Sequence, residues 1–296
     1  MRSEQLISLV RPFLPDLEMS VSFLPSNVGS RVAILSWALQ QKSQSILFFT
    51  KHAIPSVTAL VHHILKSKGC IICADYVDGD PEYLASDRID VHIASSYSSQ
   101  RKLNLLIESR KGSGSPLSQD VYVLYHAADI RLHLSVIQPK YDKLKVCYFG
   151  ALENCKFADD LQGKVTLIDG SNSVKFENGW AKLESFNAHY CIRPKNDNGS
   201  YSAKPFTKGI VAAACRSVAL VSIDTDDAVE LLGSDYPYFL SDASAEDVIS
   251  GVISLEGDFG SLDWRLALDA TMDAGRVASG ASLARSLSGL VEDLSE

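Results

Sequence analysis

Short apolar runs and longer amphipathic stretches alternate along the first half of the chain. Apolar runs bounded by Gly, Pro or Asp predict strands, and apolar residues at helical spacing predict the helices between them. The predicted strands cover residues 20–24, 45–50, 70–75, 91–94 and 121–125. The predicted helices cover residues 30–41, 55–68 and 99–110. This alternation is typical of βαβ units and a mainly parallel sheet.

The same pattern restarts with an apolar run at 145–149, which ends in a turn at Gly150. Further strands are predicted at 165–168, 189–192, 219–222 and 238–240, and a helix at 208–216. Ser244 and Asp247 have the spacing of a helix cap, so another helix is predicted to begin there. The tail is helical in pattern, but Gly275, Gly280 and Gly289 argue against one continuous helix.

These elements predict an α/β protein of two Rossmann-like domains with mainly parallel sheets. The 296 residues exceed the roughly 100–200 residues of one ordinary domain. We place the boundary near Asp142, so that the domains cover residues 1–142 and 143–296. Ligands of such sheets bind beyond the carboxyl ends of the strands.

The composition is that of a folded protein rather than a disordered or fibrous one. Hydrophobic residues make up 46% of the chain and charged residues 22%, and the formal net charge is -8. Binding to nucleic acid depends on an excess of Lys and Arg, so we expect no nucleic-acid partner. No run approaches the roughly 18 apolar residues of a membrane helix, which leaves at most a peripheral membrane contact.

The start of the chain and the cysteines indicate a cytoplasmic protein with free thiols. The residues after Met1 lack the charged and apolar segments of a secretory signal. Several of the six cysteines lie within apolar runs, which predicts buried thiols. Cys70 and Cys73 have the CxxC spacing, but no second Cys or His pair follows at the spacing of zinc ligands.

Two polar groups follow predicted strands of the first half. An imidazole titrates near neutral pH, so His126 is a candidate general base that Asp129 could orient. The alternative is a histidine whose hydrogen bonds are satisfied within its loop. Asp75, Asp78 and Asp80 lack the remaining ligands of a calcium loop, which favours a solvated acidic turn, and we expect no metal.

The most informative segment places basic residues around a helix start beyond a predicted strand. Arg193 follows the strand, Lys204 precedes the helix, and Thr207 and Lys208 lie at its first turn. A helix start offers unpaired N–H groups and a positive dipole end, and the basic side chains add charge. The segment therefore predicts a site for a nucleotide diphosphate.

This segment resembles the nucleotide-sugar-binding domain of the GT-B glycosyltransferases. The resemblance is carried by Lys204 and Pro205, Lys208 at a helix start, the alanines at 212–214, and the apolar strand at 220–222. It implies a GT-B-like architecture with a ligand cleft between the two domains and a nucleotide-sugar donor as substrate. Many retaining members place two glutamates seven residues apart here, and residues 204–216 contain no Glu. The identity of the acid that contacts the sugar therefore stays open.

The resemblance implies a set of binding residues. A donor site would include Gly150, Arg193, Lys204, Thr207, Lys208 and Glu230. Glu230 would contact the ribose, with a surface salt bridge as the alternative. The glycine-containing loop of the family's first domain would correspond to Gly29, Ser30 and Arg31, with a plain strand-to-helix turn as the alternative.

We therefore predict a glycosyltransferase that moves a sugar from a nucleotide-diphosphate donor to a hydroxyl acceptor. Glycan or polysaccharide biosynthesis is the context that the resemblance implies. Basic residues would stabilise the departing diphosphate without a metal or another cofactor. Two alternatives stay open, a catalytically inactive GT-B-like binding module and a nucleotide-sugar epimerase.

Overall fold

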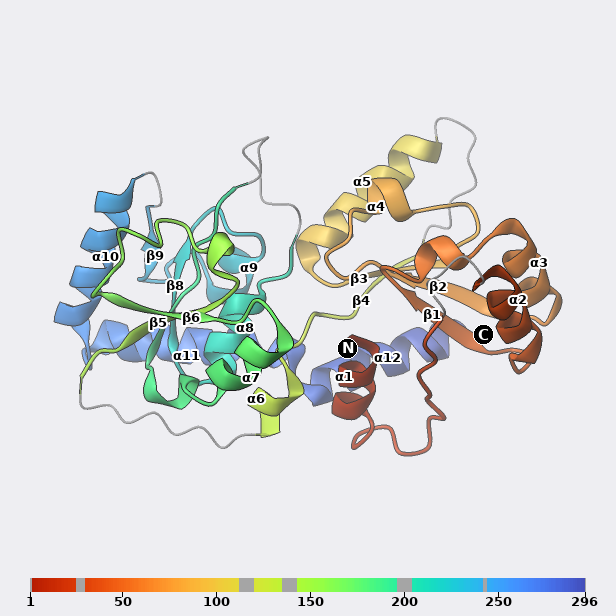
Figure 1. Cartoon of the computed structure of the whole chain (residues 1–296), viewed down its shortest axis with the longest axis horizontal. Coiled ribbons are helices and arrows are strands. Elements are labelled where there is room, and N and C mark those ends of the chain that lie inside the picture. The colour runs from red at the N-terminus through yellow and green to blue at the C-terminus, as the bar shows by residue number, and fades with distance from the viewer. Residues whose placement is uncertain are drawn as a thin grey trace. The chain divides into compact units, whose positions relative to one another are not determined.

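The computed structural model describes residues 2–24, 30–111, 120–134, 143–195, 204–241 and 244–295. The chain divides into two compact units. Unit 1 consists of Met1–His126, Ser202–Pro205 and Gly280–Glu296, and unit 2 consists of Ala127–Tyr201 and Phe206–Ser279. Each unit contains one parallel sheet (Figure 1), which confirms the predicted α/β class with two Rossmann-like sheets.

The sheet of unit 1 has four parallel strands in sequential order, β1 (Ile46–Thr50), β2 (Ile71–Asp75), β3 (Val91–Ala94) and β4 (Val121–Val123). Its helices are α1 (Arg2–Val10), α2 (Ser30–Gln40), α3 (Ala59–Ser67), α4 (Pro81–Leu84), α5 (Tyr97–Lys111) and α12 (Gly280–Asp293). Crossovers between parallel strands are right-handed. When the strands follow one another in sequential order, all connecting helices therefore lie on one face of the sheet, and the other face has none. Figure 1 shows α4 and α5 on one side of β3 and β4, and α12 on the other.

The division of the chain differs from the predicted boundary near Asp142, a residue outside the described ranges. The chain leaves unit 1 after His126, and α12 returns to unit 1 at the end of the chain. The reason is burial: Leu283, Leu287 and Leu290 form the buried face of α12. This helix lies on the face of the first sheet that carries no connecting helices (Figure 1). Composition alone does not say which core a terminal helix joins.

The predicted strand at 20–24 is wrong, because residues 18–24 have no regular structure. Alternating apolar residues suggested a half-buried strand, but the side chain of Phe23 is 76% exposed. The segment therefore buries too little apolar surface to join the sheet. The helix α1, which the sequence pattern did not indicate, precedes it.

The sheet of unit 2 has five parallel strands, β5 (Val146–Gly150), β6 (Val165–Asp169), β7 (Ala188–Tyr190), β8 (Val218–Ser222) and β9 (Phe239–Leu240). Their order is β6-β5-β7-β8-β9. Its helices are α6 (Ile130–Leu134), α7 (Ser173–Trp180), α8 (Thr207–Ala214), α9 (Ala228–Leu232), α10 (Ala245–Asp258) and α11 (Leu262–Gly275). The order reverses between β5 and β7, and such a switch point is where doubly wound sheets bind ligands.

Local sequence signals fix the helices of the second half as predicted. The hydroxyl of Ser244 accepts a hydrogen bond from the Asp247 amide at 3.1 Å, and the Asp247 carboxylate accepts one from the Ser244 amide at 3.2 Å. The tail breaks at two of the three glycines, since α11 ends at Gly275 and α12 begins at Gly280, whereas Gly289 lies within α12. A Cβ at Gly275 would lie 2.5 Å from that of Ala213, so glycine allows α11 to pack against α8.

The six cysteines are buried free thiols, as predicted. Within the described ranges, no helix is long and apolar enough to cross a membrane.

Candidate functional site

A pocket of about 520 Å³ lies at the carboxyl ends of the strands of unit 2. Its lining residues are Lys156, Lys195, Ser222, Ile223, Asp224, Phe239, Leu240 and Ser241. They come from the segments that follow β5, β7 and β8, and from β9 itself. Two of these segments flank the switch point, where a doubly wound sheet binds its ligand. The pocket is therefore the leading candidate for a ligand site in this unit.

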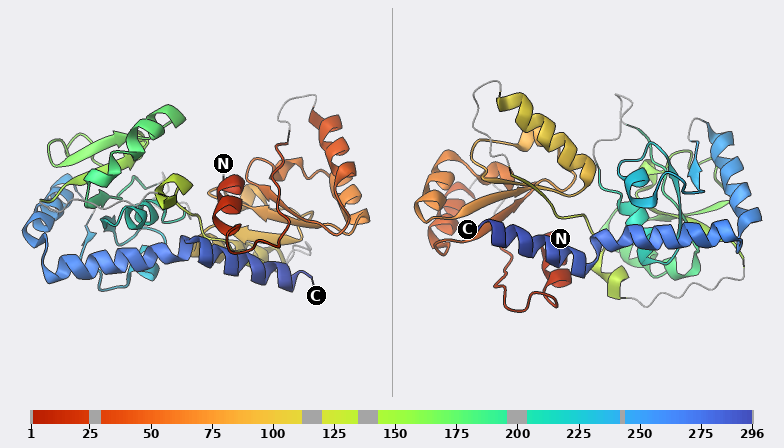
Figure 2. Two further views of the ribbon diagram at one scale, coloured as in Figure 1. Left: turned by 90° about the horizontal axis from the view of Figure 1, so that it is seen from below. Right: turned by 180° about the vertical axis from the view of Figure 1, so that it is seen from behind.

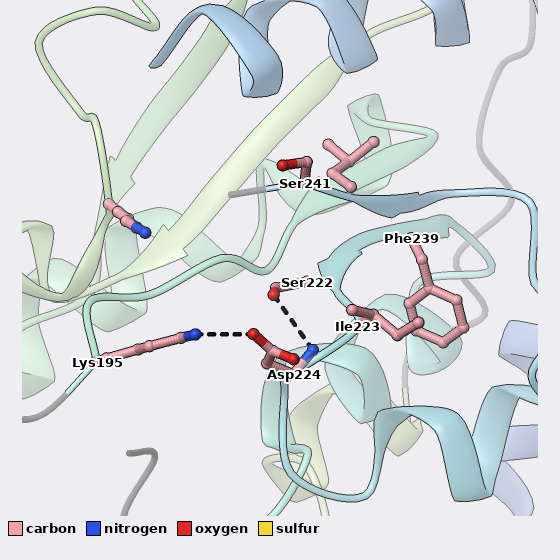
Figure 3. A pocket seen from close by; sticks show the side chains of 8 residues that line it. Lys195, Ser222, Ile223, Asp224, Phe239 and Ser241 are labelled. Carbon is pink, nitrogen blue, oxygen red and sulfur yellow. Dashed lines mark hydrogen bonds and ion pairs between the residues drawn. The ribbon is translucent and has the colours of Figure 1, made fainter. Parts of the chain in front are cut away.

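The pocket combines charged, hydroxyl and apolar groups, as Figure 3 shows. The Lys195 ammonium lies 2.7 Å from a carboxylate oxygen of Asp224. The Asp224 amide donates to the hydroxyl of Ser222 at 3.3 Å. Ile223 and Phe239 lie together on the other side, and Ile223 is 55% exposed. With two lysines and one carboxylate, the lining carries a local excess of positive charge in a chain that is acidic overall.

Lys156 is fixed by backbone contacts on both of its sides. Its amide donates to the carbonyl of Ile192 at 3.4 Å, and its carbonyl accepts the hydroxyl of Tyr190 at 2.9 Å. Its ammonium lies 4.9 Å from the ring centroid of Phe157. Because Ile192 follows β7 and Lys156 follows β5, these bonds tie together the segments on the two sides of the switch point.

Lys208, a predicted donor ligand, points to the strand β5. Its ammonium donates to the carbonyl of Phe149 at 2.9 Å and lies 3.9 Å from the ring centroid of Tyr148. A Cβ at Gly150 would lie 2.8 Å from this ammonium, and the φ of Gly150 is +147°, so glycine is needed there. Burial lowers the pKa of Lys208 to about 8, and the charge of Arg193 adds to this effect. Lys208 is not among the residues that line the pocket.

The other predicted donor residues occupy different places. Arg193 is half-buried in the segment after β7. Thr207 begins α8, whose N-cap residue has no side-chain cap. Lys204 belongs to the short segment 202–205, which is assigned to unit 1. Its charge acts on Asp78: burial raises the pKa of that carboxyl, but the hydrogen bond and charge of Lys51 outweigh burial, and Lys204 adds to the net lowering. Glu230 is exposed on α9. The structure thus brings Gly150, Lys208 and Arg193 near one another, and their role in donor binding stays a prediction.

His126, the candidate base, is oriented by Arg2 rather than by the expected Asp129. Its Nδ1 lies 2.8 Å from Nη1 of Arg2. Burial lowers the pKa of His126 to about 4, and the positive charge of Arg2 adds to this effect. Both carboxylate oxygens of Asp129 instead accept hydrogen bonds from Arg131, at 2.7 and 2.9 Å. The imidazole is therefore neutral at pH 7.

The acidic turn of unit 1 consists of three separate ion pairs. Asp75 pairs with Arg2 at 2.6 Å, Asp78 with Lys51 at 2.8 Å, and Asp80 with Lys102 at 2.9 Å. Each carboxylate thus has a cationic side chain of its own. In the part of the chain that the structure describes, no group of three or more His, Cys, Asp or Glu could hold a metal ion.

Comparison with known proteins gives a match in fold only. No family model and no curated protein matches the sequence. HepE from Anabaena in complex with UDP matches with a TM-score of 0.55 at 10% identity, over 90% of this chain and 82% of that chain. The trehalose-phosphate synthase (UDP-forming) of Burkholderia vietnamiensis matches with a TM-score of 0.54 at 10% identity, over 99% and 84%. S. aureus TarM in complex with UDP matches with a TM-score of 0.57 at 10% identity, over 88% and 58%.

These matched structures are GT-B glycosyltransferases. The chain has a GT-B fold. In this GT-B chain, the loop expected to match the family's first glycine-containing turn is only partly described: Gly29 lies outside the described residues, Ser30 begins α2, and Arg31 is exposed in its first turn. Whether this loop contacts phosphate or acceptor stays a prediction.

The residues of the GT-B chain that were missed in the sequence include Lys156, Lys195 and Arg2. Lys195 lines the pocket two positions after Arg193, which the sequence did single out. Lys156 lines the pocket. It could have been found in the sequence as the first lysine after β5 and Gly150. Arg2 contacts His126 across 124 positions of sequence. No local pattern points to such a contact, because it depends on where α1 packs.

Proposed function

We propose that the chain is a glycosyltransferase that binds a nucleotide-sugar in the pocket of unit 2. The observation that carries the proposal is the placement of Lys156 and Lys195 in a pocket beside the switch point. The matched structures of HepE contain UDP or UDP-glucose, so UDP is the first nucleotide to consider. Transfer of the sugar to a hydroxyl acceptor, in glycan assembly, is part of the proposal.

The chemistry of the pocket suits a nucleoside diphosphate. Hydrogen bonds between ammonium and phosphate groups are charge-assisted and are stronger than neutral ones. Ile223 and Phe239 offer an apolar surface to a base, and Ser222 and Ser241 offer hydroxyls. The volume of about 520 Å³ lies within the range of roughly 300–1,000 Å³ for small-molecule sites.

The same lysines would assist the reaction. When the bond between sugar and diphosphate breaks, negative charge develops on the departing diphosphate, and fixed positive groups stabilise that charge. Arg193 and the first turn of α8 at Thr207 are the proposed additional contacts, because both follow β7. The proposal requires no metal ion for this step.

A second candidate is a GT-B-like module that binds a nucleotide without turnover. It is favoured by the inward position of Lys208, whose ammonium is bonded to the carbonyl of Phe149. It is also favoured by the lack of glutamate between 204 and 216.

The deciding experiment measures the fate of a UDP-sugar panel with the wild type and with Lys156→Ala. A transferase releases UDP only when a glycan acceptor is present, and Lys156→Ala slows this release. Interconversion of the UDP-sugar without an acceptor would instead identify an epimerase. Saturable binding without turnover would identify the module, and no binding by any nucleotide-sugar would refute the proposal.

A further inference from the structure

The guanidinium of Arg2 joins two strand ends of unit 1. Its Nε donates to Asp75 Oδ2 at 2.6 Å, and its Nη2 donates to the carbonyl of Leu124 at 2.7 Å. Its Nη1 lies 2.8 Å from Nδ1 of His126. The side chain of Arg2 is 10% exposed and that of Asp75 is 3% exposed. All three guanidinium nitrogens are therefore engaged at the carboxyl edge of the sheet, where β2 and β4 end.

This geometry determines which nitrogen of His126 carries the proton. A guanidinium has only donors, so Nδ1 of His126 must accept with its lone pair. In a neutral imidazole the proton is then on Nε2. The described residues place a hydrogen-bond partner of the His126 ring at Nδ1, which leaves the Nε2–H as the group that would meet a ligand.

We propose that Arg2 is a positioning residue that holds His126 as the Nε2–H tautomer, so that His126 donates a hydrogen bond to a ligand oxygen and does not act as a base. The lone pair of Nδ1 is used by Arg2, and Nε2 already carries a hydrogen. Neither nitrogen can then take a proton from an acceptor hydroxyl. The proposal rests on the proposed function, in that the ligand oxygen would belong to a sugar or to its acceptor.

The charges that face His126 support a neutral ring. Burial lowers its pKa to about 4, and Arg2 on α1 lowers it further. Asp75 at the end of β2 and Asp78 in the following turn act in the opposite direction. Because Arg2 neutralises Asp75 directly, the carboxylates do not restore the proton to Nδ1.

Arg2 can do this only because α1 is held firmly at its other end. α1 packs against α12 (Figure 2), and Leu9 and Val10 are buried. A Cβ at Gly280 would lie 2.5 Å from the carbonyl oxygen of Leu9, so the first residue of α12 touches the backbone of α1. The first turn of α1 is thus anchored by Arg2 and its last turn by α12.

The test is the ¹⁵N spectrum of the His126 ring in the full chain between pH 5 and 8. In the wild type we expect the Nε2–H tautomer and no titration in this range. In Arg2→Met, loss of the guanidinium should raise the pKa of His126 from about 4 by about one pH unit or more, so that the imidazolium signal appears at the lower end of this range. Arg11→Met is the control, because the guanidinium of Arg11 donates to the carbonyl of Met19 rather than to a group near His126.

Arg2→Met leaves the carboxylate of Asp75 buried without its partner, and this could prevent folding. Arg2→Met combined with Asp75→Asn removes that charge, and here the two ring nitrogens should share the proton. A wild-type His126 that titrates near pH 6.5, or carries its proton on Nδ1, overturns the proposal. These spectra need no turnover, so a failure of the proposed function would leave them unchanged.

Where transfer is measurable, the donor role has a second readout. His126→Gln keeps an N–H donor but no base, so its kcat should stay within about tenfold of the wild type. Loss of a general base lowers kcat by roughly 10²–10⁴-fold. If kcat fell by that much in His126→Gln, and by as much as in His126→Ala, the donor role would be contradicted.

Discussion

Gly209 offers a sharp test of how the first turn of α8 is built. A Cβ at this position would lie 1.9 Å from Cε1 and 2.1 Å from Cζ of Phe206, whose ring is 2% exposed. The ring therefore lies directly over the glycine. Gly209→Ala would force the ring out of its place in the core of unit 2, and overpacking of this kind costs roughly 1–3 kcal/mol.

The opposing effect is the higher helix propensity of alanine, which contributes at most about 1 kcal/mol. A cost of about 3 kcal/mol less this gain leaves a net loss of about 2 kcal/mol in the free energy of unfolding. The assay is urea unfolding followed by circular dichroism. Gly257→Ala on α10 is the matched control, since no atom lies within 4 Å of its Cβ position. Equal stability of the two variants would show that Phe206 does not cover Gly209.

Two further predictions concern the dependence of stability on pH. The pKa of Lys208 is lowered to about 8, so its buried charge lowers the free energy of unfolding below that pH. When urea unfolding is repeated from pH 8 to 10, the wild type should gain stability relative to Lys208→Met. A difference that stays constant over this range would contradict the prediction. Burial lowers the pKa of His189 to about 3, so the unfolded state takes up a proton that the folded state does not as the pH falls below the usual histidine pKa. His189→Leu should therefore flatten the loss of stability between pH 6 and 4 by about 1.4 kcal/mol per pH unit, and parallel profiles for the two proteins would refute the assignment.

The sequence was sufficient for most elements of the fold. Buried parallel strands are dense in apolar residues, as in Val218–Ser222, and this density is a local signal. The cap at Ser244 is local too, since its two hydrogen bonds join residues three apart. The alternating apolar residues at 20–24 are a local signal too, but Phe23 is exposed and the segment is not a strand. A local pattern does not show whether a neighbouring strand is present to pair with.

The candidate site was predicted less well, because its contacts join distant segments. The sequence singled out Lys208 as a ligand, but its ammonium turns to the carbonyl of Phe149, 59 positions away. Lys156 and Lys195 reach one pocket from segments after different strands. Arg2 reaches His126 only because α12, at the other end of the chain, packs along α1. Such partners follow from topology and not from spacing.

The central claim is that the pocket of unit 2 binds a nucleoside diphosphate, and isothermal titration with UDP tests it most directly. The account predicts saturable binding by the wild type and affinity about tenfold to a hundredfold weaker for Lys156→Ala, since a hydrogen bond to a charged group contributes roughly 1.5–3 kcal/mol. Lys164→Ala, which removes an exposed lysine of the same unit, should bind like the wild type. Absence of binding by the wild type, or equal affinity of Lys156→Ala, would contradict the account.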